Sequence, residues 1–72
     1  MSKYRHLWMY IDLIFKRTNK EKIELSFNQI KDAIGFDIDH SFLTYKKELL
    51  DYGYKVEKIK LKDKIIIFLK ID

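Results

Sequence analysis

Apolar side chains near the N-terminus recur at the spacing of a helix. They occupy positions 4, 7, 8, 11, 14 and 15, which places them on one face of a helix running from Tyr4 to about Arg17. Lys16 and Arg17 fall in its last turn, where positive charge is favourable to the helix dipole. The polar run TNKEK that follows predicts a loop.

The segment KIELSF alternates strictly between polar and apolar side chains, which predicts a half-buried strand ending where a helix begins. Ser26 and Gln29 have the spacing of a capping box, in which the Ser26 hydroxyl accepts from the Gln29 amide and the Gln29 side chain accepts from the Ser26 amide. The helix that follows carries apolar residues at 27, 30 and 34 on one face. Gly35 is expected to end it in the left-handed conformation.

A third helix is predicted from about His40 to Tyr52, capped by Asp39 and ended by Gly53. At 100° per residue, positions 40, 44, 47 and 51 gather on its exposed side. Its inner stripe is expected to consist of Phe42, Tyr45, Leu49 and Tyr52, with Leu43 and Leu50 on the flank.

The last twenty residues predict a β-hairpin. Val56, Ile59 and Leu61 are out of phase with one another, which indicates a bulge near Glu57 or Lys58. LKDK is the expected turn, and the unbroken apolar run IIIFL predicts a central strand, covered on both faces or paired on both edges. Helix, strand, helix, helix, strand, strand is the order of a winged helix-turn-helix, an α+β fold with three helices and a small antiparallel three-stranded sheet. Other small α+β arrangements use the same elements.

Length and composition limit the possible classes of protein. Seventy-two residues predict one domain, residues 1–72, and 47% hydrophobic residues favour an ordered core. The absence of cysteine excludes disulfides and thiolate zinc sites and fits a cytoplasmic protein. The run LWMYIDLIF is too short, and too interrupted by Asp12, for a signal peptide or a membrane span. The same carboxylate weakens the alternative of a first helix lying on a membrane.

The net charge of +4 is unevenly distributed. Residues 1–22 carry six basic and two acidic side chains, residues 54–70 repeat that balance, and residues 23–53 are acidic on balance. Basic ends suit a polyanionic partner, although a solvated surface is the ordinary explanation of such charge.

The stretch GFDIDHSF contains the one cluster that suggests metal chemistry, Asp37, Asp39 and His40. A hard cation needs more oxygen ligands than this segment offers, and zinc needs several nitrogen or sulfur donors. A helix cap explains the cluster better, because Asp39 directly precedes the third helix. Glu48 and Asp51 are interpreted as solvated surface carboxylates. Since the chain has no phosphate loop and no nucleophile motif, we expect no metal, no cofactor and no enzymatic activity.

Two groups of residues are candidates for contact with nucleic acid. Lysines at every second position of the hairpin can project toward one phosphate strand, although lysines also protect an edge strand from aggregation. The third helix offers polar side chains on its exposed side, although Glu48 and Asp51 would repel phosphate and both arginines lie on the first helix. Sequence specificity is therefore expected to be modest or to depend on a partner. The candidate contact residues are Lys58, Lys60, Lys62 and Lys64 on the hairpin, and His40, Ser41, Thr44 and Lys47 on the helix.

Aromatic residues at helical spacing usually belong to a core. Tyr10 and Tyr54 are the two aromatic residues for which exposure, with a stacking or binding role, is kept as an alternative.

The stretches KYRHLWMYI, IELSFNQIKDAIGF, LLDYGYKVEKIKL and IFLK together resemble a small bacterial domain family to which no activity is assigned. The resemblance spans nearly the whole chain and implies a winged-helix-like fold. The family commonly has Leu-Pro after the glycine and a Trp-Trp-x-Asn stretch before its last helix ends. This chain has DIDHSFLTYKKEL there, so the resemblance implies no function for that segment.

The sequence thus predicts a small winged-helix-like domain that binds nucleic acid, with DNA as the expected partner. The alternative is a protein-interaction module, such as a small regulator or inhibitor, that uses exposed aromatic residues and the acidic middle of the chain.

Overall fold

The computed structural model describes residues 3–71, and it begins with the predicted helix. Helix α1 (Arg5–Thr18) buries Leu7, Trp8, Ile11 and Phe15 on one face. It ends at Asn19, whose φ of 57° lies in the left-handed region that asparagine tolerates better than most residues. The prediction of this helix is confirmed.

The capping box is present in full where strand β1 (Lys22–Ser26) meets helix α2 (Phe27–Ile34). The Gln29 amide donates to the Ser26 hydroxyl over 3.0 Å, and the Ser26 amide donates to the Gln29 side chain over 2.8 Å. Gly35 ends α2 with a φ of 85°. The strand is one residue shorter than predicted, because the cap already commits Phe27 to the helix.

The predicted third helix is two elements. Helix α3 covers Ser41–Tyr45, and the tighter 3₁₀ helix η1 continues over Lys46–Tyr52. Phe42 and Leu49 are buried as predicted, but Tyr45 and Tyr52 are each 38% exposed. The predicted inner stripe is therefore wrong in half of its members.

The residues around Gly53 explain why Tyr52 is outside the core. Gly53 has a φ of 93° and reverses the chain into strand β2 (Tyr54–Lys60). The reversal directs Tyr54 inward, where its ring stacks on Phe15 with 4.4 Å between ring centroids. Tyr54 is only 5% exposed and donates its hydroxyl to Asp12 over 2.7 Å, so the candidate exposure of Tyr54 is wrong. Tyr10 is partly buried against the core.

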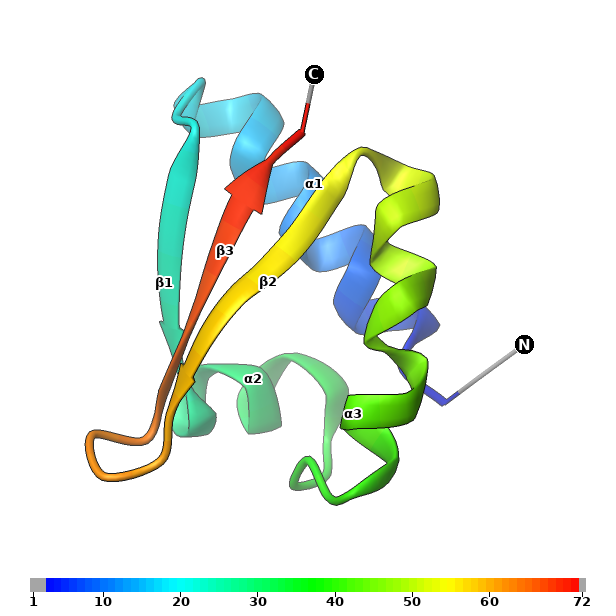
Figure 1. The fold of residues 1–72 in the computed structure, drawn as a ribbon, viewed down its shortest axis with the longest axis vertical. Coiled ribbons are helices and arrows are strands. Elements are labelled where there is room, and N and C mark those ends of the chain that lie inside the picture. The colour runs from blue at the N-terminus through cyan, green and yellow to red at the C-terminus, as the bar shows by residue number, and fades with distance from the viewer. Residues whose placement is uncertain (1–2, 72) are drawn as a thin grey trace.

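The sheet has the predicted order, with strand β3 (Ile65–Lys70) between β1 and β2 in antiparallel pairing. The register of β2 against β3 shifts between Val56 and Lys58, which confirms the bulge. The chain is therefore an α+β protein with the predicted sequence of helices and strands, as Figure 1 shows.

The central strand is paired on both edges but covered by helices on one side only. Ile66 and Phe68 belong to the core, which α1 closes from behind the sheet in Figure 1. Side chains alternate across a strand, so Ile65, Ile67 and Leu69 occupy the opposite face. Ile67 is 4% exposed without being part of that core, and it is paired with Glu24 of β1 and Lys58 of β2.

Candidate nucleic-acid interface

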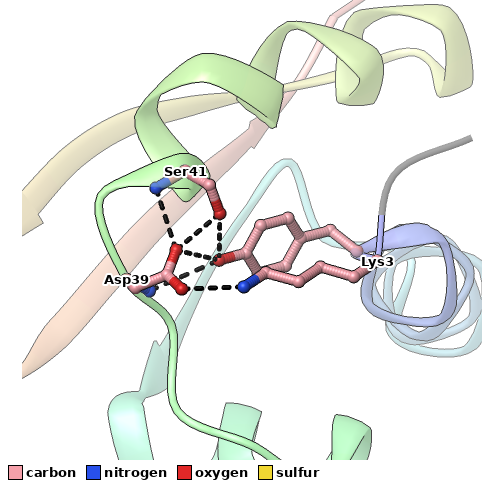
Figure 2. A network of polar contacts seen from close by, with 4 residues as sticks. Lys3, Asp39 and Ser41 are labelled. Carbon is pink, nitrogen blue, oxygen red and sulfur yellow. Dashed lines mark hydrogen bonds and ion pairs between the residues drawn. The ribbon is translucent and has the colours of Figure 1, made fainter.

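Asp39 is the centre of a polar network that joins the start of the chain to the start of α3 (Figure 2). Its carboxylate accepts from the Lys3 ammonium at 2.7 Å, from the Tyr4 hydroxyl at 3.2 Å and from the Ser41 amide at 2.9 Å. The Ser41 hydroxyl also donates to it. The N-cap position of α3 is His40, one residue after the predicted cap, and Asp39 instead accepts from the first backbone amide of the helix. Asp39 in addition tethers the segment before α1.

The neighbouring acidic residue has a separate partner. Asp37 lies 3.6 Å from the Lys31 ammonium, as an exposed ion pair. Within residues 3–71, no three histidine or carboxylate side chains are arranged to hold a metal ion. GFDIDHSF is therefore the connection between two helices, held by Asp39.

The Asp39 network gives the protein a defined response to acid. The Lys3 ammonium, followed by the Ser41 hydroxyl and amide, holds the pKa of Asp39 well below its usual value of about 3.9. The folded state therefore prefers the ionised carboxylate, and this stabilisation is complete above about pH 4 and is lost as the pH falls further. We expect Asp39→Asn to flatten the loss of stability below pH 4, as measured by urea unfolding at a series of pH values.

Asp37→Asn is the matched control for this prediction, because it removes an acidic residue two positions away that makes only an exposed ion pair. Its stability should follow the wild-type pH profile. An Asp39→Asn profile as steep as that of the wild type would show that Asp39 does not contribute to the acid response.

The third-helix candidates differ in how available they are. His40, Thr44 and Lys47 are exposed. Ser41 is half-buried, and its hydroxyl lies 3.2 Å from that of Tyr4 while donating to Asp39. The structure thus assigns the Ser41 side chain to the network that holds α3, and leaves three of the four residues accessible.

The hairpin lysines do not all lie on one surface. Lys58 and Lys60 pair with Ile67 and Ile65 of β3, so they share the sheet face that no helix covers. Lys62 and Lys64 belong to the turn at residues 61–64. Lys64 has a φ of 55°, and its carbonyl accepts from the Phe27 amide over 2.8 Å, which fastens the turn to the start of α2.

Two further lysines lie on the open sheet face together with Lys58 and Lys60, and neither was among the predicted contact residues. Lys22 of β1 and Lys55 of β2 are both paired with Leu69 of β3, on the same open face. Lys22 also lies 3.9 Å from Glu57. The alternation of KIELS places Lys22 on the polar side of its strand, but only the pairing of both strands with β3 shows that it faces the same way as the hairpin lysines.

An apolar groove separates the hairpin turn from α3. It has a volume of about 600 Å³, and its exposed rim includes Leu43 at 52% and Leu61 at 75% exposure. Its walls come from three separate segments, so no local sequence pattern predicts it. The remaining lining residues are Phe27, Ile38, Asp39, His40, Phe42 and Ile59.

Glu48 is not the solvated carboxylate that the sequence suggested. It accepts a hydrogen bond from the indole nitrogen of Trp8 over 2.9 Å, and Trp8 is 1% exposed. Glu48 therefore provides the acceptor that a buried donor requires. The neighbouring Asp51 is exposed, as expected.

Comparison with models of protein families, with curated proteins and with solved structures found no match. The resemblance to a bacterial domain family accordingly stays a prediction. Among the helices of residues 3–71, none has the length and apolar character required to cross a membrane.

Proposed function

We propose that this protein is a non-enzymatic, cytoplasmic domain that binds nucleic acid, with duplex DNA as the main ligand. The observation that carries the proposal is the placement of the hairpin lysines. Lys58 and Lys60 project from an uncovered sheet face, and the turn adds Lys62 and Lys64 at its end. Against these four cations, residues 58–64 include one carboxylate, Asp63.

Such an array favours contact with phosphates over the reading of bases. Lysine is a compact positive charge on a flexible stem, and it binds phosphate without fixing a sequence. Release of counterions from DNA would then provide most of the affinity, so binding should weaken steeply with salt. Thr44 of α3, His40 directly before it and Lys47 of η1 are accessible for additional contacts, and Ser41 would take part only by leaving Asp39.

The test removes three exposed hairpin cations. In the variant Lys58→Gln, Lys62→Gln, Lys64→Asn, asparagine is chosen for residue 64 because it tolerates the positive φ there. We expect the affinity for a mixed-sequence DNA duplex to fall roughly tenfold, and the slope of log K against log salt to decrease by about one for each lysine that contacts phosphate. Fluorescence anisotropy at several salt concentrations measures both.

The matched control removes three exposed cations elsewhere, by Arg5→Gln, Arg17→Gln and Lys20→Gln. It has the same net charge as the hairpin variant. Equal losses in the two variants would show that only net charge matters, and would remove the hairpin from the proposal. Absence of binding by the wild type at low salt would end the nucleic-acid proposal itself.

A second candidate function is protein interaction, and the apolar groove is the observation that favours it. Clusters of exposed aliphatic side chains framed by polar residues are typical of protein-binding surfaces. Nucleic acid offers little for an apolar groove to bind. The groove and the open sheet face can serve different ligands, because Ile59 and Lys60 point to opposite sides of β2.

A further inference from the structure

We propose that the groove between α3 and the hairpin binds a short acidic segment of a partner protein, which inserts one or two large apolar side chains and places its carboxylates at the hairpin end. This inference does not depend on nucleic-acid binding, because its apolar contacts are made by residues that the nucleic-acid proposal does not use.

The groove has the construction of a binding site for side chains. Phe42, which is 1% exposed, forms part of its floor, and Leu43 and Leu61 stand at its rim with half or more of their surface in solvent. A volume of about 600 Å³ lies within the range of sites that enclose small ligands. The groove can accept a few side chains of a short peptide segment. A partner protein with a flat surface would leave it unfilled.

The walls of the groove are held in place before any ligand arrives. The Asp39 network fixes the start of α3 to the segment before α1. On the other side, the hydrogen bond from the Phe27 amide to the Lys64 carbonyl holds the hairpin turn against α2. A preformed site loses less entropy on binding than a surface that must order itself.

Charge selects an acidic ligand. Lys62 and Lys64 follow Leu61 in the exposed hairpin turn, with Asp63 between them as the opposing charge. The carboxylate that lines the groove, Asp39, already forms an ion pair with Lys3 at 2.7 Å. The hairpin end of the groove is therefore positive, and carboxylates beside the apolar side chains of the ligand would be attracted there, whereas lysines would be repelled.

The two lysines of the hairpin turn would be shared between DNA and the acidic segment. Lys62 and Lys64 would contact the acidic segment and, in the proposed function, phosphates. An acidic segment in the groove would therefore compete with DNA for these two lysines.

The experiment selects ligands from random peptides displayed on phage, using the full-length protein. We expect enrichment of sequences that combine one or two large apolar residues with Asp or Glu. A synthetic peptide of an enriched sequence should bind the variant Leu43→Gln, Leu61→Gln about tenfold more weakly or worse, because the variant removes apolar surface that the peptide would bury. Both leucines are exposed in the free protein, so the variant should fold.

Leu50→Gln is the matched control, because Leu50 is 52% exposed, like Leu43, but does not line the groove. Its affinity for the peptide should equal that of the wild type. Equal binding to the wild type and to the Leu43→Gln, Leu61→Gln variant would overturn the proposal. Enrichment of basic or neutral apolar peptides, or of none, would also overturn it.

Measuring DNA binding by the same proteins distinguishes failure of the peptide-binding proposal from failure of the nucleic-acid proposal. The Leu43→Gln, Leu61→Gln variant should bind DNA as the wild type does, because it changes no charge. Loss of peptide binding with retained DNA binding is the result expected if both proposals are correct. Peptide binding by a wild-type protein that does not bind DNA would reject the proposed function alone.

Discussion

Replacement of Phe42 by alanine is expected to lower the free energy of unfolding by about 3–5 kcal/mol. The ring is 1% exposed and packs edge-on against Tyr4, with 5.6 Å between ring centroids. It also packs against Trp8 in a tilted arrangement, with 5.8 Å between ring centroids. Truncation leaves a cavity between α1 and α3, which these rings join. A domain of this size has a total stability on the order of 5 kcal/mol, so a large fraction of the variant should be unfolded at room temperature. Urea unfolding followed by circular dichroism measures the loss.

The adjacent leucine provides the control. Leu43→Ala removes a side chain of comparable type from the same helix, but one that is 52% exposed. Its effect should stay within about 0.5 kcal/mol, as for other surface substitutions. Similar losses in the two variants would show that the buried aromatic packing of Phe42 contributes no more to stability than an exposed side chain of the same helix.

The second large effect is expected at Glu48. Its carboxylate accepts from the Trp8 indole nitrogen over 2.9 Å, and Trp8 lies in the core. Glu48→Ala would leave a buried donor without this acceptor, which costs about 1–3 kcal/mol. The contact also ties η1 to α1, so the tryptophan emission of the folded variant should shift as its environment changes. Urea unfolding and fluorescence spectra measure the two effects.

Two further variants separate the hydrogen bond from the charge. Glu48→Gln keeps an acceptor oxygen and should recover most of the stability lost in Glu48→Ala. Asp51→Ala removes a neighbouring exposed carboxylate and should have little effect. Losses in Glu48→Gln as large as in Glu48→Ala would show that the negative charge, and not the acceptor, stabilises this contact.

The two ligand surfaces meet at the hairpin. On β2, Lys58 and Lys60 face away from the helices, whereas Ile59 packs toward the core and lines the groove. The turn at residues 61–64 lies at the end of both surfaces, and the two proposals both depend on its lysines. The same short segment would therefore supply affinity for phosphate and selectivity for an acidic partner.

Local sequence determined most of the secondary structure. The capping box at Ser26 and Gln29, the glycine stop at Gly35 and the bulge after Val56 depend on neighbouring residues or on alternation along one strand, and all three are present. The central position of IIIFL also follows from its own composition, because a continuous apolar strand must be paired on both edges or covered on both faces. Such features need no information from distant parts of the chain.

The tertiary structure decided which side chains are accessible. Tyr54, Glu48 and Ser41 are polar or amphipathic residues that a local pattern assigns to the surface, and each is instead engaged by a partner on α1 or close to it. The groove and the open sheet face likewise combine residues from separate elements, such as Lys22 with Lys55. Periodicity reports which face of its own element a residue occupies, whereas exposure depends on what the rest of the chain places opposite that face.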